Sequence, residues 1–294
     1  MQKILNKILK KEPIVEYITT GDEILDKRIM GYQKGELITI ASRPKFGKTA
    51  FALNSVVDNI KKGKKVFYVI LGETSETIIA KILSQMLNIH VKDILLGTYD
   101  EIETIELQNA IDIISEFLIL EEDLFMDIEY LFNRSFGLCD DIELLVIDGM
   151  EYLKSLCDNV NIIKSIKEEA YKNQIPIILL TSININVEKR VEKRPRLCDI
   201  NNAQDISEYS DKVIAIYSDD YYKEKSEAKK ERILKSKGVD YKSTFINKPF
   251  IEKEIIILKN SFGMDATLKR EFKKMTASFV NQKIQETKIE IVYE

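Results

Sequence analysis

The chain alternates between short runs of apolar, β-branched residues and longer segments in which apolar residues recur every three or four positions. The short runs are typical of strands that are covered on both faces, and the longer segments are typical of helices that cover them. The predicted strands lie at 38–42, 65–71, 117–120, 142–148, 175–182 and 213–217. The predicted helices lie from Thr49 onward and at 76–98, 101–119, 126–136 and 161–173. This alternation indicates an α/β fold with a mainly parallel central sheet flanked by helices.

The C-terminal third of the chain departs from this pattern. Residues 254–259 and 268–272 are two strand-type runs joined by the turn at 261–265, which predicts a C-terminal β-hairpin. Before them, the segment 219–253 is rich in Lys and Glu and has few apolar positions. We expect a solvated helix or a mobile insertion there rather than a binding site.

The N-terminus shows a short amphipathic pattern. Over residues 2–11, Ile4, Leu5, Ile8 and Leu9 fall on one helical face and lysines fall on the other. A helix of this length has nothing local to bury its apolar face. It therefore either folds back on its own domain or docks on a neighbouring subunit.

Composition narrows the class of protein. The 294 residues are 45% hydrophobic and 31% charged, which is enough for a large core, and no apolar run reaches membrane-spanning length. We therefore expect a cytoplasmic protein with no membrane partner. A net charge of −4 predicts no global attraction to nucleic acid. Three cysteines without metal-ligand spacing indicate reduced thiols, and a single histidine, His90, disfavours histidine-based catalysis.

The strongest chemical signal is the junction between the strand at 38–42 and the helix that begins at Thr49. A loop of this kind, between a strand and a helix, binds phosphates through its backbone N–H groups and the positive end of the helix. We expect it to bind ATP, with Lys48 neutralising the phosphates and Thr49 ligating Mg²⁺. The alternative is a chance Gly-Lys-Thr at a helix start. The residues of the predicted loop are Ser42, Arg43, Pro44, Lys45, Phe46, Gly47, Lys48, Thr49 and Ala50.

Two acidic residues stand where other predicted strands end. Glu73 follows the strand at 65–71, and Asp148 terminates the strand at 142–148. Because the carboxyl ends of parallel strands meet at one edge of a sheet, both carboxylates are expected near the loop. Asp148 would hold Mg²⁺ from the side opposite Thr49, and Glu73 would activate water. The alternatives are a helix-capping acid at Glu73 and a solvated strand-end acid at Asp148.

Two segments near the start carry a resemblance to a known family. They are the run Thr-Thr-Gly-Asp-Glu-Ile-Leu-Asp at 19–26 and the segment 31–54, which contains the phosphate loop. They resemble the ATPase domain of DnaB-type replicative helicases, a RecA-like family in which a small residue such as alanine commonly replaces the first motif glycine, as Ser42 does here. The similarity continues with gaps to about residue 275.

The resemblance implies a domain organisation. It implies a RecA-like P-loop ATPase core over 15–275, interrupted by a charged insertion at 219–253. Residues 1–14 would form a linker-type amphipathic helix, and residues 276–294 would form a C-terminal tail. We expect the family's separate N-terminal domain to be missing.

The resemblance also assigns residues at the far side of the site. Glu73 matches the family's catalytic glutamate, and Lys259 matches the lysine of a Lys-x-Arg pair that reaches the ATP site of a neighbouring subunit. Ser261 stands where the family has the arginine, which leaves Lys269 or Arg270 as candidate substitutes. An arginine finger accelerates phosphoryl transfer by several powers of ten in other systems, so this exchange predicts weakened hydrolysis.

Two further departures concern phosphate sensing and DNA. Ile183 replaces a glutamine that senses the γ-phosphate, which leaves Asn184 as the nearest amide. Where the family has an Arg-Glu-Ser-Gly loop that holds single-stranded DNA, this chain has amides, so DNA binding should be weaker and less salt-dependent. The expected DNA-contacting residues are Asn201, Asn202 and Gln204.

Taken with the resemblance, these features imply a ring ATPase, hexameric as in the family, that translocates on single-stranded DNA and unwinds duplex during replication. Other replication proteins are candidate partners. The departures at Ile183, Asn201 and Ser261 leave a second hypothesis open, in which an ATP-binding, weakly hydrolysing paralogue acts as a regulatory or structural partner of a complete helicase. A RecA-type recombinase is a third, disfavoured by the helicase-like segments at 18–54 and 188–200.

Overall fold

The computed structural model describes residues 2–10, 16–123, 126–137, 141–153, 161–241, 248–263 and 265–280. Pro13, Cys139, Cys157 and the expected tail beyond residue 280 lie outside these ranges. Cys198, which lies inside them, is an exposed free thiol. Within this part of the chain, no helix is both long and apolar enough to cross a lipid bilayer.

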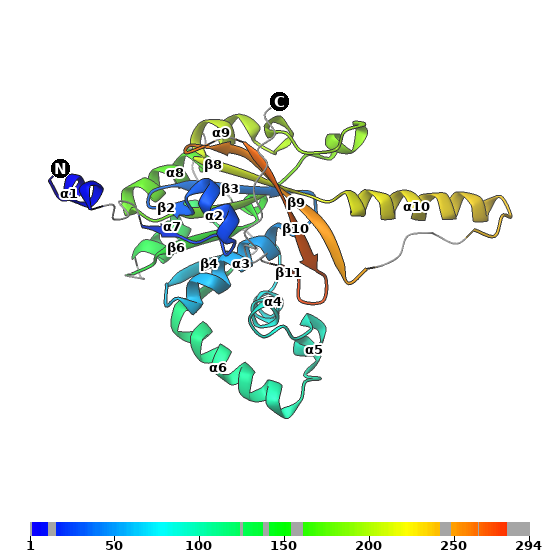
Figure 1. Ribbon diagram of the computed structural model, residues 1–294, viewed down its shortest axis with the longest axis horizontal. Coiled ribbons are helices and arrows are strands. Elements are labelled where there is room, and N and C mark those ends of the chain that lie inside the picture. Colours follow the sequence, from blue (N-terminus) through cyan, green and yellow to red (C-terminus); the bar gives the residue numbers. More distant parts are fainter. Residues whose placement is uncertain are drawn as a thin grey trace.

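A twisted sheet runs through the centre of the molecule (Figure 1). Across the described ranges its strand order is β11-β10-β9-β8-β3-β7-β6-β4-β5. Six of these strands pair in parallel, and their residues are almost all buried except along the edge strand β5, which confirms the expected parallel core. These are β3 (Leu37–Ser42), β4 (Val66–Ile70), β5 (Leu118–Glu122), β6 (Leu144–Asp148), β7 (Ile177–Ser182) and β8 (Lys212–Tyr217).

Helices cover both faces of this sheet, as the helical spacing predicts. One layer, below the sheet in Figure 1, contains α3 (Lys48–Lys61), α4 (Ser75–Leu87), α5 (Val91–Leu96) and α6 (Glu101–Phe117). The other contains α7 (Ile128–Gly137), α8 (Ile162–Asn173) and α9 (Ala203–Tyr209). Shorter elements are α1 (Gln2–Leu9), β1 (Tyr17–Ile18), α2 (Glu23–Ile29), β2 (Tyr32–Gln33), η1 (Met150–Tyr152), η2 (Ile185–Lys189) and η3 (Leu197–Asp199).

The helix expected over 76–98 is interrupted. The backbone of Asn88 takes a left-handed conformation with φ 63°, which ends α4. The side chain of His90 then accepts a hydrogen bond from the backbone N–H of Lys92 and caps α5. A single apolar periodicity therefore spans two helices, because local caps rather than the pattern decide where a helix stops.

The last part of the sheet is antiparallel. It contains β9 (Phe250–Asn260), β10 (Ala266–Lys273) and β11 (Ser278–Phe279), and the predicted hairpin is its β9–β10 pair. Strand β9 begins inside the range assigned to the charged insertion, and β11 lies inside the range assigned to the tail. Before them, α10 (Asp219–Ser236) has no buried residue and extends away from the sheet (Figure 1).

A buried ion pair joins the antiparallel strands to the start of the chain. Arg270 of β10 is 4% exposed, and its guanidinium donates to both carboxylate oxygens of Asp22, at 2.5 and 3.0 Å. Asp22 is also the N-cap of α2, because its side chain accepts hydrogen bonds from the N–H groups of Ile24 and Leu25. The pair thus joins α2 to the C-terminal hairpin.

We predict that Asp22→Asn, which retains a capping oxygen but leaves the buried guanidinium without its counter-charge, lowers the free energy of unfolding by about 3 kcal/mol. Urea denaturation of the wild type, the single variants and the double variant Asp22→Asn with Arg270→Met measures this. The double variant should recover most of the loss. Lys269→Met, on the exposed face of the same strand, serves as the control. An Asp22→Asn variant as stable as that control contradicts the prediction.

Candidate nucleotide site

The predicted phosphate loop lies between the carboxyl end of β3 and the amino end of α3. Two of its residues have left-handed backbones, with φ 71° at Lys45 and 95° at Gly47. Gly47 is also the N-cap residue of α3 and supplies no side-chain cap, so the first N–H groups of a 14-residue helix face out of its end. This backbone is suited to binding phosphate, because the uncapped N–H groups and the positive end of the helix dipole both point out of the N-terminus of α3.

Three side chains converge on the carboxylate of Asp148 at the end of β6. The hydroxyl of Thr49 donates to its Oδ2 at 2.8 Å, and the hydroxyl of Tyr68 donates to the same oxygen at 2.9 Å. The Nζ of Lys48 lies 3.9 Å from Oδ1. Lys48, Thr49 and Asp148, which sequence reasoning singled out, therefore lie together in the structure.

The electrostatics of Asp148 follow from this arrangement. Burial raises the pKa of its carboxyl above the ordinary value, whereas the Lys48 ammonium and the hydrogen bonds from Thr49 and Tyr68 pull that pKa down. Burial, together with the Asp148 charge, holds the pKa of Tyr68 well above its usual value. Tyr68 is therefore a permanent hydrogen-bond donor to the carboxylate.

The donor set fits Mg²⁺ and a polyphosphate. A hydroxyl and a carboxylate are hard oxygen ligands of the kind Mg²⁺ takes, with water and phosphate oxygens completing its shell. Within the described ranges, no group of three or more His, Cys, Asp or Glu could hold a metal ion.

Glu73 lies just past the carboxyl end of β4, at the same end of the sheet as Asp148. Its charge contributes to raising the pKa values of Asp148 and Tyr68, although it is not the largest cause for either. The carboxylate forms an ion pair with Lys81 of α4. The N-cap of α4 is Thr74, whose side chain accepts from the N–H of Thr77. Glu73 does not fill the capping role that was its alternative reading.

The phosphate loop is held from the side by residues that follow β7. Arg43 donates from Nη1 to the carbonyl of Ile183 at 2.8 Å and from Nε to Glu188 at 3.1 Å. Glu188 also accepts from Lys225 of α10 at 3.1 Å. The loop is thus linked through Glu188 to the helix that leaves the sheet.

Ile183 is buried, and its N–H donates to the carbonyl of Ser42, so it supports the loop strand instead of presenting a polar side chain. The Asn184 side chain caps η2 by accepting from the N–H of Asn186 at 2.9 Å. Nearby, a cleft of about 720 Å³ is lined by four amides and lies beyond the end of β7. Those amides belong to Asn184, Asn186, Asn201 and Asn202; Gln204 is exposed on the following helix.

Lys259, the hairpin residue expected to act on a neighbouring subunit, contacts the end of α9 in its own chain. Lys259 pairs with Val213 in the sheet, and its Nζ donates to the carbonyls of Ser207 and Ser210 at 2.9 and 2.6 Å. Of the candidate substitutes for the missing arginine, Arg270 is buried on Asp22, while Lys269 is exposed beside Glu252 at 2.9 Å. The side of β10 that each occupies was not decided by sequence.

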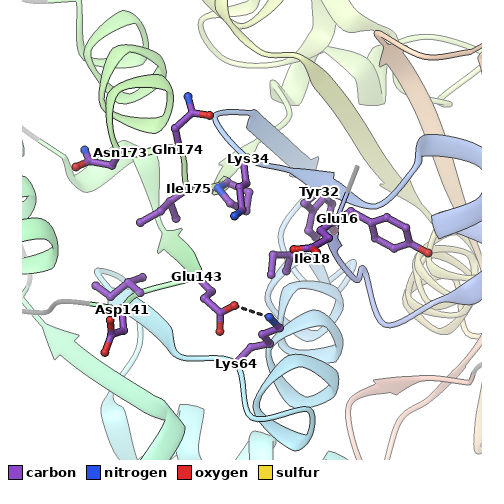
Figure 2. Close-up of a pocket in the computed structure, with 13 residues that line it drawn as sticks. Glu16, Ile18, Tyr32, Lys34, Lys64, Asp141, Glu143, Asn173, Gln174 and Ile175 are labelled. Carbon is purple, nitrogen blue, oxygen red and sulfur yellow. Dashed lines mark hydrogen bonds and ion pairs between the residues drawn. The ribbon is translucent and has the colours of Figure 1, made fainter. Parts of the chain in front are cut away.

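A second pocket, of about 380 Å³, lies at the opposite edge of the sheet. Figure 2 shows Lys64 and Glu143 paired across it, with Lys34 and Asn173 on other walls. It collects residues from the amino ends of β6 and β7, whereas the phosphate loop and Asp148 lie at carboxyl ends. The nucleotide residues therefore do not belong to this pocket.

Sequence reasoning missed Tyr68 and Glu188. Tyr68 is the one hydroxyl within an otherwise apolar strand, Val66–Ile70, and such a hydroxyl needs a partner when it is buried. That signal could have identified it. Glu188 sits in a run of mixed charges in which no single carboxylate stands out.

The fold and the site define a RecA-like P-loop nucleotide-binding domain. Residues 17–281 match the family model described as the DnaB-like helicase C terminal domain. The chain belongs to this family.

Curated relatives agree with the assignment. The chain is 29% identical over 277 residues to "Replicative DNA helicase DnaC" of Bacillus subtilis, covering 90% of this chain and 56% of that protein. It is 26% identical over 304 residues to "Replicative DNA helicase DnaB" of Helicobacter pylori, covering 93% of this chain and 62% of the relative. The chain thus spans somewhat over half of these relatives.

Solved structures show the same fold. A solved ATPase domain matches with a TM-score of 0.77 at 22% identity, covering 96% of both chains. The structure titled "The Structure Of A DnaB-Like Replicative Helicase And Its Interactions With Primase" matches with a TM-score of 0.76 at 22% identity, covering 96% of this chain and 65% of that one.

We predict that Lys48→Ala weakens MgATP binding by about tenfold or more, because a charge-assisted contact to phosphate contributes on the order of 1.5–3 kcal/mol. Calorimetry at fixed Mg²⁺ measures this. Lys62→Ala, which removes an exposed lysine just past the other end of the same helix, should bind like the wild type. Equal affinity of Lys48→Ala and the wild type would remove the phosphate-loop assignment.

Proposed function

We propose that this chain is the ATP-driven motor domain of a DnaB-like helicase, which hydrolyses ATP and translocates on single-stranded DNA in replication. The observation that carries the proposal is the convergence of Lys48, Thr49 and Asp148 at a helix N-terminus, in a chain that belongs to this family. The relatives named replicative DNA helicases support the reaction class. This chain spans somewhat over half of those proteins. Duplex unwinding, an activity of the whole proteins, is therefore part of the proposal.

Each residue has a distinct task in hydrolysis. When bound, MgATP supplies the phosphoryl group and the metal charge that polarises it. Lys48 would neutralise phosphate oxygens, and the loop N–H groups would orient them. Asp148, kept in place by Tyr68, would hold the water shell of the ion. Glu73 would accept a proton from the attacking water, a role for which its pairing with Lys81 must loosen.

We predict that Glu73→Gln leaves MgATP affinity close to that of the wild type and lowers kcat by about a hundredfold or more, because the amide cannot accept the proton. A coupled ATPase assay with and without single-stranded DNA measures turnover, and calorimetry measures affinity. Glu76→Gln, on the first turn of α4, is the matched control. If turnover survives in Glu73→Gln, another group is the base.

Assembly into a ring is supported by two exposed apolar surfaces. On α1, Leu5, Ile8 and Leu9 are exposed, which leaves the apolar face of this helix uncovered in a single chain. Another exposed set lies on α5, on α6 and in the segment between them. We propose that the exposed apolar face of α1 of one subunit packs against exposed apolar residues of the next subunit in the ring. The second set is Leu95, Leu96, Tyr99, Ile102 and Ile105.

A ring would also let the hairpin act on a neighbouring site. In a single chain Lys259 donates to two neutral carbonyls. In a ring it could instead donate to a phosphate oxygen of the ATP bound by the adjacent subunit. Ser261 donates to the carbonyl of Asp211 at 3.0 Å and offers no positive charge. With Ile183 buried as well, these positions favour slow hydrolysis. They also keep the alternative of a weakly hydrolysing partner subunit of a complete helicase.

We predict slow, DNA-stimulated turnover that rises more than linearly with protein concentration over the range in which the oligomer forms. Lys259→Ala should lower this turnover, and Ser261→Arg should raise it by about tenfold or more, because transition-state charge is then stabilised. ATPase rates and oligomer size are measured on the same samples.

The contrary result is a rate strictly proportional to concentration and unaffected by either substitution, which rules out a shared intersubunit site. If the oligomer forms but only an added complete helicase restores turnover, the partner-subunit alternative holds.

A further inference from the structure

A lysine lies buried against the phosphate loop, and the proposed hydrolysis does not use it. Lys253, near the start of β9, is 1% exposed. Its amine donates to the carbonyl oxygen of Phe46 at 2.8 Å. The amine also lies 3.1 Å from the ring centre of Phe272 and 5.4 Å from that of Phe279. A buried lysine usually has a carboxylate partner, whereas this one contacts a carbonyl oxygen and two aromatic rings.

The same amine restricts the next loop residue. A Cβ added at Gly47 would lie 2.7 Å from the Nζ of Lys253, closer than real Cβ atoms approach a neighbour, so the lysine amine would have to shift. The φ of 95° at Gly47 independently favours glycine. Lys253 therefore fills the space alongside Gly47 and contacts the carbonyl immediately before it.

These two contacts act on a single peptide unit. The carbonyl of Phe46 and the N–H of Gly47 belong to one planar group, and the peptide is trans, since the described residues contain no cis bond. The C=O and N–H of a trans peptide point in opposite directions. A donor that holds the carbonyl of Phe46 on one side thus aims the N–H of Gly47 to the other side, which is how such loops present amides to phosphate.

The side chain of Phe46 is held from a second direction. Its ring is buried and makes edge contacts with three tyrosine rings. One of these, Tyr217, ends β8, and the other two, Tyr221 and Tyr222, lie in the first turns of α10. Lys253 then joins the backbone of the same residue to β9. The region that composition alone marks as a solvated insertion is anchored at the loop.

The charge of this lysine is sensitive to pH. Burial, and secondarily the positive charge of Lys274, lowers the pKa of Lys253 to about 7. The ammonium form donates more strongly than the amine and places a positive charge beside the loop. Lys253 lines a cavity of about 700 Å³ between α10 and the hairpin. The other charged groups that line it are Lys45, Asp220, Glu224, Lys225, Arg232 and Lys274.

We propose that Lys253 is a positioning residue for the phosphate loop, which fixes the peptide between Phe46 and Gly47 and thereby couples affinity for MgATP to the antiparallel extension β9–β11. The inference rests on the proposed function, because it requires the loop to bind ATP. It adds a residue that does not touch the nucleotide but acts through the loop backbone.

The test is MgATP affinity of Lys253→Met at several pH values. Methionine keeps the length of the side chain and its packing on Phe272, but it cannot donate to the Phe46 carbonyl. We expect affinity about tenfold weaker than in the wild type at pH 6.5, because the lost bond is charge-assisted, with the thermal midpoint little changed. As pH rises through 7, the wild-type amine loses its proton and the gap between the two proteins should narrow. Titration of ATP itself affects both proteins equally and cancels in their ratio.

Lys248→Met, which removes an exposed lysine just before β9, is the control and should bind as the wild type does. A Lys253→Met variant with wild-type affinity overturns the proposal. So does a loss of affinity that is the same at every pH, since that would indicate general packing. If Lys253→Met does not fold, Lys253→Gln replaces it; the uncharged amide should abolish the pH dependence specific to the wild type, and persistence of that dependence overturns the proposal. Lys48→Ala distinguishes a failure of this inference from a failure of the proposed function, because unchanged MgATP affinity in Lys48→Ala would refute the ATP site itself.

Discussion

The hydrogen bond from Thr49 to Asp148 joins the start of α3 to the end of β6, residues that are 99 positions apart in the chain. It depends on the register of the parallel sheet, in which Asp148 lies opposite Ile70 on one side and Leu180 on the other. A slip of one residue would turn the Asp148 side chain to the other face of the sheet. The buried carboxylate in turn depends on its donors, because an unpaired charge there would be strongly destabilising.

The functional residues expected around the Thr49–Asp148 hydrogen bond fall into two groups. Those that would bind nucleotide and metal are held by regular elements of the core, and each has partners inside the chain. Those expected to sense phosphate or to reach a neighbouring subunit are altered: Ile183 is buried beneath the loop and Ser261 donates to a carbonyl. This division is the basis for the proposal that the domain binds ATP but hydrolyses it slowly.

Much of this arrangement could be predicted from sequence. The parallel core, the hairpin and the grouping of Lys48, Thr49 and Asp148 follow from apolar runs that end in specific polar residues, since carboxyl ends of parallel strands meet at one edge. What could not be predicted are contacts between distant segments. Lys253 lies in a Lys- and Glu-rich range, where composition indicates solvent, and its burial depends on Phe272 and Phe279 arriving from strands further along.

Side-chain direction in β10 was undecidable for a related reason. Alternation says that Lys269 and Arg270 face opposite sides, but it cannot say which side is buried when both residues are basic. The carboxylate of Asp22, 248 positions away, decides it, because only a counter-charge allows the guanidinium to be buried. Long-range pairing of charges is therefore the part of the fold that periodicity does not reveal.

The central claim is that the backbone of the 42–50 loop binds the phosphates of ATP. Hydrogen exchange of the wild-type protein, followed by mass spectrometry with and without MgATP, tests it directly. The account predicts slowed exchange in the loop and first turn of α3, with smaller slowing at β9 through Lys253. Binding of MgATP that leaves exchange in this segment unchanged, and slows it elsewhere, would contradict the account.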